Sequence, residues 1–161
     1  VLLSASTVLA AAPKGNPPAE RNSKPIFIKS DRFESDTQGN RVVFIGNVVA
    51  KQDDMTMTSD RMTVIYTPGG EDVERVESVG NVKIVQGARV GTGGKGVYEN
   101  AKGTVTLTEN PKIVQDKDTI TGTVIVYDLV KERSTVTAAP DTRVEAVIHP
   151  RKKEPSDQRR P

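Results

Sequence analysis

The chain has 161 residues, a formal net charge of +2 and no cysteine. A length of this order predicts one domain, and the lack of cysteine excludes disulfides, thiolate metal sites and cysteine nucleophiles. The near-neutral charge argues against a dedicated nucleic-acid-binding protein, which would carry a strongly basic stripe.

The first twelve residues, VLLSASTVLAAA, form an apolar run that ends in small residues. The run is too short to span a bilayer, which requires about 20 apolar residues, and Ala10-Ala11-Ala12 resembles a signal-peptide cleavage site. Residues 1–12 are therefore interpreted as a signal-peptide remnant, with a disordered N-terminal tail as the alternative. A secretory signal in a chain without cysteine favours the bacterial periplasm.

Two further segments are expected to lie outside the folded domain. Residues 13–24 (PKGNPPAERNSK) are rich in proline and charge and are interpreted as a linker. Residues 150–161 (PRKKEPSDQRRP) are interpreted as a disordered polar tail. The folded domain is thus expected over residues 25–149.

Within this window, apolar residues alternate with polar ones in short runs bounded by Gly, Asn, Asp or Pro. Examples are Ile26/Ile28, Val42/Phe44 and Met55/Met57. A period of two predicts half-buried antiparallel strands, and no long stretch carries apolar residues at helical spacing. The sequence therefore predicts an all-β domain of short strands.

The chain also repeats itself about every 30 residues. IKSDRF (28–33) returns as MTSDRM (57–62), and FIGNVVAKQ (44–52) returns as SVGNVKIVQ (78–86) and, more weakly, as LTENPKIVQ (107–115). Such a period predicts stacked supersecondary units that share a continuous apolar interior with two ends.

Residues that could suggest chemistry are better explained structurally. The segment 87–96 lacks the first glycine and the Ser/Thr of a phosphate loop and is interpreted as a glycine-rich turn. Asp116-Lys117-Asp118 is interpreted as a hairpin turn rather than a calcium loop. Asp31 and Asp60 recur at equivalent repeat positions, which indicates one structural role filled twice, such as bonding a turn backbone. With His149 as the only histidine, no histidine cluster can hold a metal. No catalytic residue, cofactor or metal is expected.

Residues 24–66 resemble the opening of the LptA/OstA family. The matching motifs are Pro25-Ile26-Phe27-Ile28 with Ser30-Asp31, Gly39-Asn40, Gly46-Asn47-Val48 with Gln52, and Met57-Thr58-Ser59-Asp60. A second Gly-Asn-Val stands at 80–82, and the resemblance extends over roughly residues 25–148. The chain departs from the family at Ser59, where alanine is frequent, and at Glu109-Asn110-Pro111, where the third Gly-Asn pair is degraded.

The resemblance implies a twisted antiparallel β-jellyroll, built as a stacked β-repeat, with an apolar groove open along one side. It also implies a periplasmic bridge that shields the acyl chains of lipid A. The implied partners are lipopolysaccharide, an LptC-like inner-membrane protein, an LptD-like outer-membrane translocon and further copies of the chain.

Strand alternation predicts which residues face the interior. The residues alone leave open whether they fill a core or line a groove for lipid. A structural β-repeat protein with a filled core and no lipid cargo is therefore the alternative, and a carbohydrate-active β-solenoid enzyme is a less favoured third. As lipid-binding residues we expect Ile26, Ile28, Phe44, Val48, Met55, Met57, Met62, Val64, Val82, Ile84, Tyr98, Val105, Leu107, Ile113, Ile120, Val124 and Val126.

Two strand edges are expected to remain unpaired, one at each end of the stack. They belong to the first strand, residues 25–30, and the last, residues 142–148. Unpaired edges invite strand addition. Joining the last strand of one copy to the first of the next predicts head-to-tail oligomers.

Overall fold

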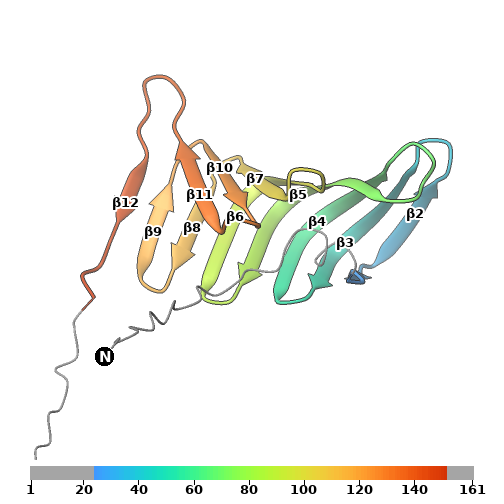
Figure 1. The fold of residues 1–161 in the computed structure, drawn as a ribbon, viewed down its shortest axis with the longest axis horizontal. Helices are drawn as coiled ribbons and strands as arrows, with labels where there is room; N and C mark the ends of the chain where they lie inside the picture. The colour runs from blue at the N-terminus through green and yellow to red at the C-terminus, as the bar shows by residue number, and fades with distance from the viewer. Residues whose placement is uncertain (1–23, 152–161) are drawn as a thin grey trace, which may run out of the picture.

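The computed structural model describes residues 24–151, which form one antiparallel sheet of twelve strands. Figure 1 shows the strands following one another along the long axis, from β2 at one end to β12 at the other. The strands are β1 (Phe27–Lys29), β2 (Arg32–Asp36), β3 (Arg41–Gln52), β4 (Met55–Tyr66), β5 (Val73–Gln86), β6 (Arg89–Glu99), β7 (Thr104–Thr108), β8 (Lys112–Gln115), β9 (Asp118–Thr121), β10 (Val124–Asp128), β11 (Arg133–Thr137) and β12 (Glu145–Val147). The all-β, antiparallel prediction is confirmed.

The four central strands, β3 to β6, are long, and each is interrupted near its middle. The register shifts between Ile45 and Val48, between Thr58 and Arg61, and between Val79 and Val82. In β6 the partner changes from β8 to β7 at the same level. The short strands expected within residues 41–99 are therefore halves of these four long strands, because a bulge interrupts the alternation without ending the strand.

The interruptions divide the sheet into two half-sheets, because β3 and β6 each pair with two strands on one side. Half-sheet A contains β2, residues 41–45, 61–66, 73–79 and 95–99 of the long strands, and β7, β10 and β11. Half-sheet B contains β1, residues 48–52, 55–58, 82–86 and 89–92, and β8, β9 and β12. Each end of the sheet thus exposes two edges, β1 with β2 and β11 with β12. The edges expected at residues 25–30 and 142–148 are present as β1 and β12, but β2 and β11 add a second edge at each end, because the strand pairing forks.

The repeated Ser-Asp and Gly-Asn motifs form the corners where half-sheet A bends into half-sheet B. Asn47 Nδ2 donates to Asp31 Oδ2 at 2.8 Å, and Asn81 Nδ2 donates to Asp60 Oδ2 at the same distance. Gly46, like its counterpart in the second repeat, has a left-handed backbone, with φ values of 81° and 80°. The two acids thus share a structural role, as predicted, although their partner is an asparagine amide rather than a turn backbone.

The third corner keeps this geometry without the glycine. Glu109 and Asn110 have φ values of 62° and 58°. The Glu109 carbonyl accepts the Gly94 amide at 2.9 Å, just as the Gly46 carbonyl accepts the Asp31 amide at 3.0 Å. The degraded third motif is therefore still a corner.

The glycine-rich segment 87–96 is not a turn between strands, as expected, but mostly the first half of β6. Its buried glycines lie where the half-sheets approach each other: a Cβ on Gly91 would lie 2.9 Å from Leu107 Cδ1, and one on Gly96 would lie 3.0 Å from Val82 Cγ1. Composition suggested a turn, whereas these glycines serve close packing. The hairpin turn at Asp116-Lys117 is confirmed, with Gln115 paired to Asp118.

The half-sheets pack their inward faces against each other. One buried cluster contains Val48, Met57, Met62, Val64 and Val76, and a second contains Val82, Leu107, Ile113 and Ile125. Within the first, Ser78 of half-sheet A donates its hydroxyl to Met57 Sδ of half-sheet B at 3.1 Å. The predictions for residues 1–12, 13–23 and 152–161 lie outside the described residues.

Candidate functional site

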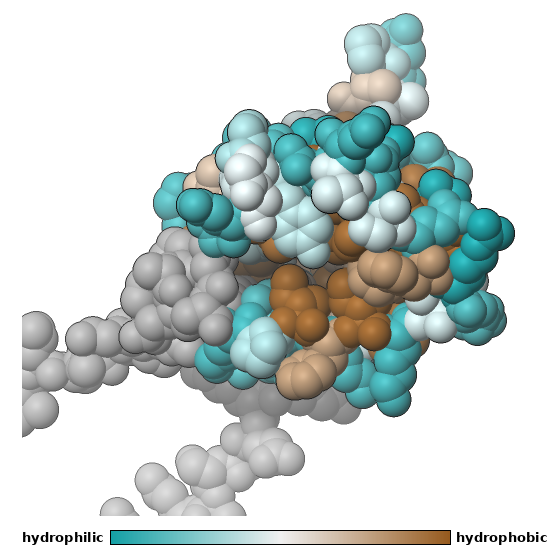
Figure 2. All heavy atoms as spheres, turned by 90° about the vertical axis from the view of Figure 1, so that its right-hand side faces the viewer, coloured by the Kyte–Doolittle hydropathy of each residue, from teal (hydrophilic) through white to brown (hydrophobic). Residues whose placement is uncertain are grey.

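The apolar interior between the half-sheets is open at the end formed by β1 and β2. A hollow of about 710 Å³ opens there. Figure 2 looks onto this end and shows hydrophobic side chains gathered around a recess, framed by hydrophilic ones. The apolar and aromatic part of its lining consists of Ile26, Ile28, Phe44, Val64, Tyr66, Val73 and Tyr98.

Deeper inside, the interior narrows to two small gaps of about 50 and 30 Å³. Gaps of this size hold little more than one or two water molecules. The first lies among residues such as Met57, Met62 and Val76, and the second among Leu107, Ile113 and Ile125. The middle of the interior is thus nearly filled by side chains, whereas the β1–β2 end contains the larger hollow.

Most residues expected to face the interior do so, because cross-strand partners share a face of the sheet. One row in half-sheet B joins Ile28, Met57, Ile84, Ile113 and Ile120, and Val48 and Val82 are buried beside the corners. Two rows in half-sheet A join Phe44, Met62 and Leu107, and Val64, Tyr98 and Val105. Ile26 and Met55 line the gaps. Lipid contact by these residues stays a prediction.

The inward assignment of Val124 and Val126 is wrong. Ile125 is only 1% exposed and pairs with the inward Leu107, and Tyr127 pairs with Val105. The connection at Gly122-Thr123 interrupts the alternation, so inward side chains fall on an even position in β9, at Ile120, and on odd positions in β10, at Ile125 and Tyr127. The equally regular odd-numbered pattern of Ile125, Tyr127 and Leu129 was the available signal.

Sequence reasoning missed a row of side chains, polar except for Met55, along the open side opposite the corners, here called the mouth. Cross-strand pairing joins this mouth row in the order Gln52, Met55, Gln86, Arg89, Gln115 and Asp118. The turns of both half-sheets flank it, and a polar hollow of about 220 Å³ opens outside it between Arg89 and Glu132.

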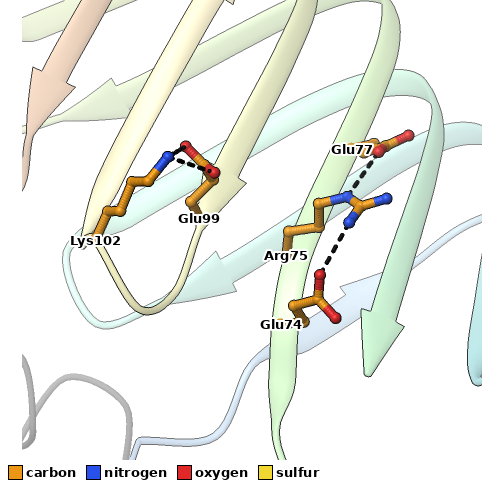
Figure 3. Close-up of polar contacts among 5 residues, drawn as sticks. All are labelled: Glu74, Arg75, Glu77, Glu99 and Lys102. Atoms are coloured by element: carbon orange, nitrogen blue, oxygen red, sulfur yellow. Dashed lines mark hydrogen bonds and ion pairs between the residues drawn. The ribbon is translucent and has the colours of Figure 1, made fainter. Parts of the chain in front are cut away.

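The outer face of half-sheet A carries neutralised charges. Arg75 Nε contacts Glu77 at 2.9 Å and a terminal guanidinium nitrogen contacts Glu74 at 2.9 Å, while Lys102 pairs with Glu99 (Figure 3). The hydrogen bond that Arg75 donates to Glu77 is the main cause that raises the pKa of Arg75. Such exposed pairs contribute little stability, and their charges are already satisfied.

Within residues 24–151 no group of acidic or histidine side chains is arranged to hold a metal. The same residues contain no helix with the length and apolar character needed to cross a membrane. The remaining candidate site is the apolar interior with its polar mouth.

Comparison with known proteins identifies the family that has this architecture. Residues 27–133 match the family described as LptA/(LptD N-terminal domain) LPS transport protein. The lipopolysaccharide export system protein LptA of Escherichia coli K12 is 36% identical over 140 residues, covering 82% of this chain and 74% of the relative. LptH of Pseudomonas aeruginosa, also named a lipopolysaccharide export system protein, is 29% identical over 150 residues, covering 84% and 85%.

The solved structure of Pseudomonas aeruginosa LptH has the same fold. It is described as the LptA-homologous periplasmic component of the conserved lipopolysaccharide transport device. It superposes with a TM-score of 0.73 at 25% identity, covering 81% of this chain and 99% of that one. With the family match spanning most of the sheet and a relative above 30% identity, this chain belongs to the LptA/LptD N-terminal domain family of lipopolysaccharide transport proteins.

Proposed function

We propose that this protein binds lipopolysaccharide in the periplasm and passes it between membranes, with the acyl chains held between the half-sheets. The observation that carries the proposal is the hollow at the β1–β2 end, which leads from solvent into an apolar interior. Its relatives are named for lipopolysaccharide export, and one is a periplasmic component.

The shape of the interior suits a carrier that must release its cargo. Each buried methylene group contributes about 0.8 kcal/mol, so a fully enclosed chain of a dozen carbons would gain about 10 kcal/mol. Several such chains would dissociate very slowly. A hollow that is open at one end and nearly filled in the middle encloses only part of each chain, which keeps transfer reversible.

The sheet edges would dock the partners. Phe27 and Phe33 are exposed at one end, and Val147 and Ile148 at the other. Strand addition at these edges would join β12 of one copy to β1 of the next, and β11 to β2. The same edges would receive an LptC-like inner-membrane protein and an LptD-like outer-membrane translocon, provided that each presents a similar sheet.

Photocrosslinking tests the cargo site. A photoreactive residue at Ile28 or Ile84 should crosslink to lipopolysaccharide, because both side chains face the interior. Matched controls are Lys29 and Lys83, the next residues on the same strands, which point to the opposite face. Equal crosslinking from both pairs would reject the interior as the binding site.

Truncation tests the joint. Deleting residues 142–161 removes β12 and should weaken self-association in analytical ultracentrifugation while lipid binding persists. Deleting only residues 152–161 keeps β12 and should leave assembly unchanged. If both truncated chains assemble like the full chain, half-sheet B does not form the joint.

A further inference from the structure

Arg89 is the one arginine of residues 24–151 that lines the gaps of the interior. It lies in the mouth row between Gln86 and Gln115 and is partly buried. None of the described carboxylates lies within ion-pair distance of its guanidinium. This differs from Arg75 on the outer face, which contacts two glutamates at 2.9 Å (Figure 3).

The contacts that Arg89 does make are weak ones. Its Nε and a terminal nitrogen each lie 3.4 Å from Gln115 Oε1, beyond the usual range of about 2.7–3.2 Å. Its guanidinium carbon lies 4.6 Å from the ring centroid of Tyr127, across the mouth in half-sheet A. A cation–π contact of this kind contributes less than a charge-assisted hydrogen bond. Arg89 thus carries a partly buried positive charge that has no anionic partner within residues 24–151.

The position of Arg89 separates an apolar space from a polar one. On the inner side is the gap lined by Ile84, Leu107 and Ile125. On the outer side is the polar hollow lined by Asp54 and Glu132. A ligand bridging the two spaces must have an apolar tail and a polar head, and its tail must part the side chains around the inner gap, which is about 30 Å³ as it stands.

Gln86, which lies beside Arg89, carries a second group that lacks a partner among the described residues. Gln86 Oε1 is buried and finds no hydrogen-bond partner among the described residues. Its Nε2 donates to the Asp54 carboxylate at 3.2 and 3.3 Å, so the free group is an acceptor. A buried acceptor without a donor is costly. It would be satisfied by a hydroxyl or amide N–H near the head of the ligand.

We propose that Arg89 and Gln86 form a head-group site for an acylated phosphate monoester at the mouth of the interior. The planar guanidinium exchanges Tyr127 and Gln115 for a bidentate contact with the phosphate, while Gln86 Oε1 accepts from a hydroxyl or amide of the same molecule. Asp54 and Glu132 repel a free anion in the outer hollow, so the acyl tail is required for binding. This inference rests on the proposed function, because lipid A combines these groups.

The test measures binding to three probes by wild type, Arg89→Gln and the matched control Arg61→Gln. Arg61 is exposed on the outer face, and the control removes the same charge. The probes are phosphorylated lipid A, the same lipid A after enzymatic removal of its phosphates, and inorganic phosphate. Arg89→Gln should weaken binding of phosphorylated lipid A by about tenfold to a hundredfold, the value of a charge-assisted contact. Binding of the dephosphorylated form should be unchanged, Arg89→Lys should restore only part of the loss, and Arg61→Gln should behave as wild type.

Several outcomes would overturn the inference. Equal weakening for both lipids would mean that Arg89 only holds the mouth together, and no weakening would mean that it does not contact the head group. Inorganic phosphate binding as tightly as phosphorylated lipid A would mean a free-anion site. If wild type retains neither lipid, the proposed function fails as well. If wild type binds both forms but ignores the substitution, only the head-group site fails.

Discussion

Replacing Gly80 by alanine isolates the contribution of one corner. Gly80 has a φ of 80°, and a Cβ there would overlap Asp60 Oδ2 and lie 2.9 Å from two carbons of the same side chain. Alanine therefore adds backbone strain of about 1–2 kcal/mol. It also displaces the carboxylate that Asn81 donates to at 2.8 Å, which costs about 1 kcal/mol for an exposed bond. The expected loss of unfolding free energy is about 2–3 kcal/mol.

Urea unfolding followed by far-UV circular dichroism measures this loss, which should lower the midpoint by about 1–2 M at an unchanged slope. Gly87→Ala is the matched control, because Gly87 has a φ of 57° with no atom within 4 Å of the added Cβ, so only the strain remains. In an Asp60→Ala background, Gly80→Ala should also cost only the strain. A loss equal to that of Gly87→Ala, or one undiminished by Asp60→Ala, would refute this account of the corner.

Three further outcomes are expected. Met62→Ala should lower the unfolding free energy by about 2–5 kcal/mol in the same assay, because this side chain is only 1% exposed; Val79→Ala, at a position that is 46% exposed, should cost far less. A photoreactive group at Ile125 should crosslink to lipid A and one at Val126 should not, since the strand turns them to opposite faces. The pKa of Asp128 is lowered, chiefly by the hydrogen bond that the backbone N–H of Lys131 donates to its carboxylate. The ionised carboxylate therefore stabilises the fold above the unfolded pKa of about 3.9, and this stabilisation is lost as the pH falls through the lower folded pKa. Asp128→Asn should accordingly flatten the acid limb of a pH-unfolding curve.

The order of the motifs was sufficient to indicate the family. The Gly-Asn pairs are corner residues whose left-handed backbone only a few residue types adopt readily, and the Ser-Asp pairs supply the carboxylates that bond them, so both stay visible in sequence. Glu109 shows the limit of that signal, because it holds a left-handed backbone where the motif has glycine. Its equivalence to Gly46 is clear only from the carbonyl hydrogen bond that the two residues share.

The sequence by itself determined the inward faces of most strands, because alternation is a local property of extended backbone and each side chain's direction follows from its neighbours. It could not determine that β3 and β6 each bind two partners, nor that the parity shifts between Ile120 and Ile125. Pairing and register join residues far apart in the chain, and a one-residue slip reverses every face. For the same reason only the tertiary structure brought Gln86, Arg89 and Gln115 into one row at the mouth, opposite Tyr127.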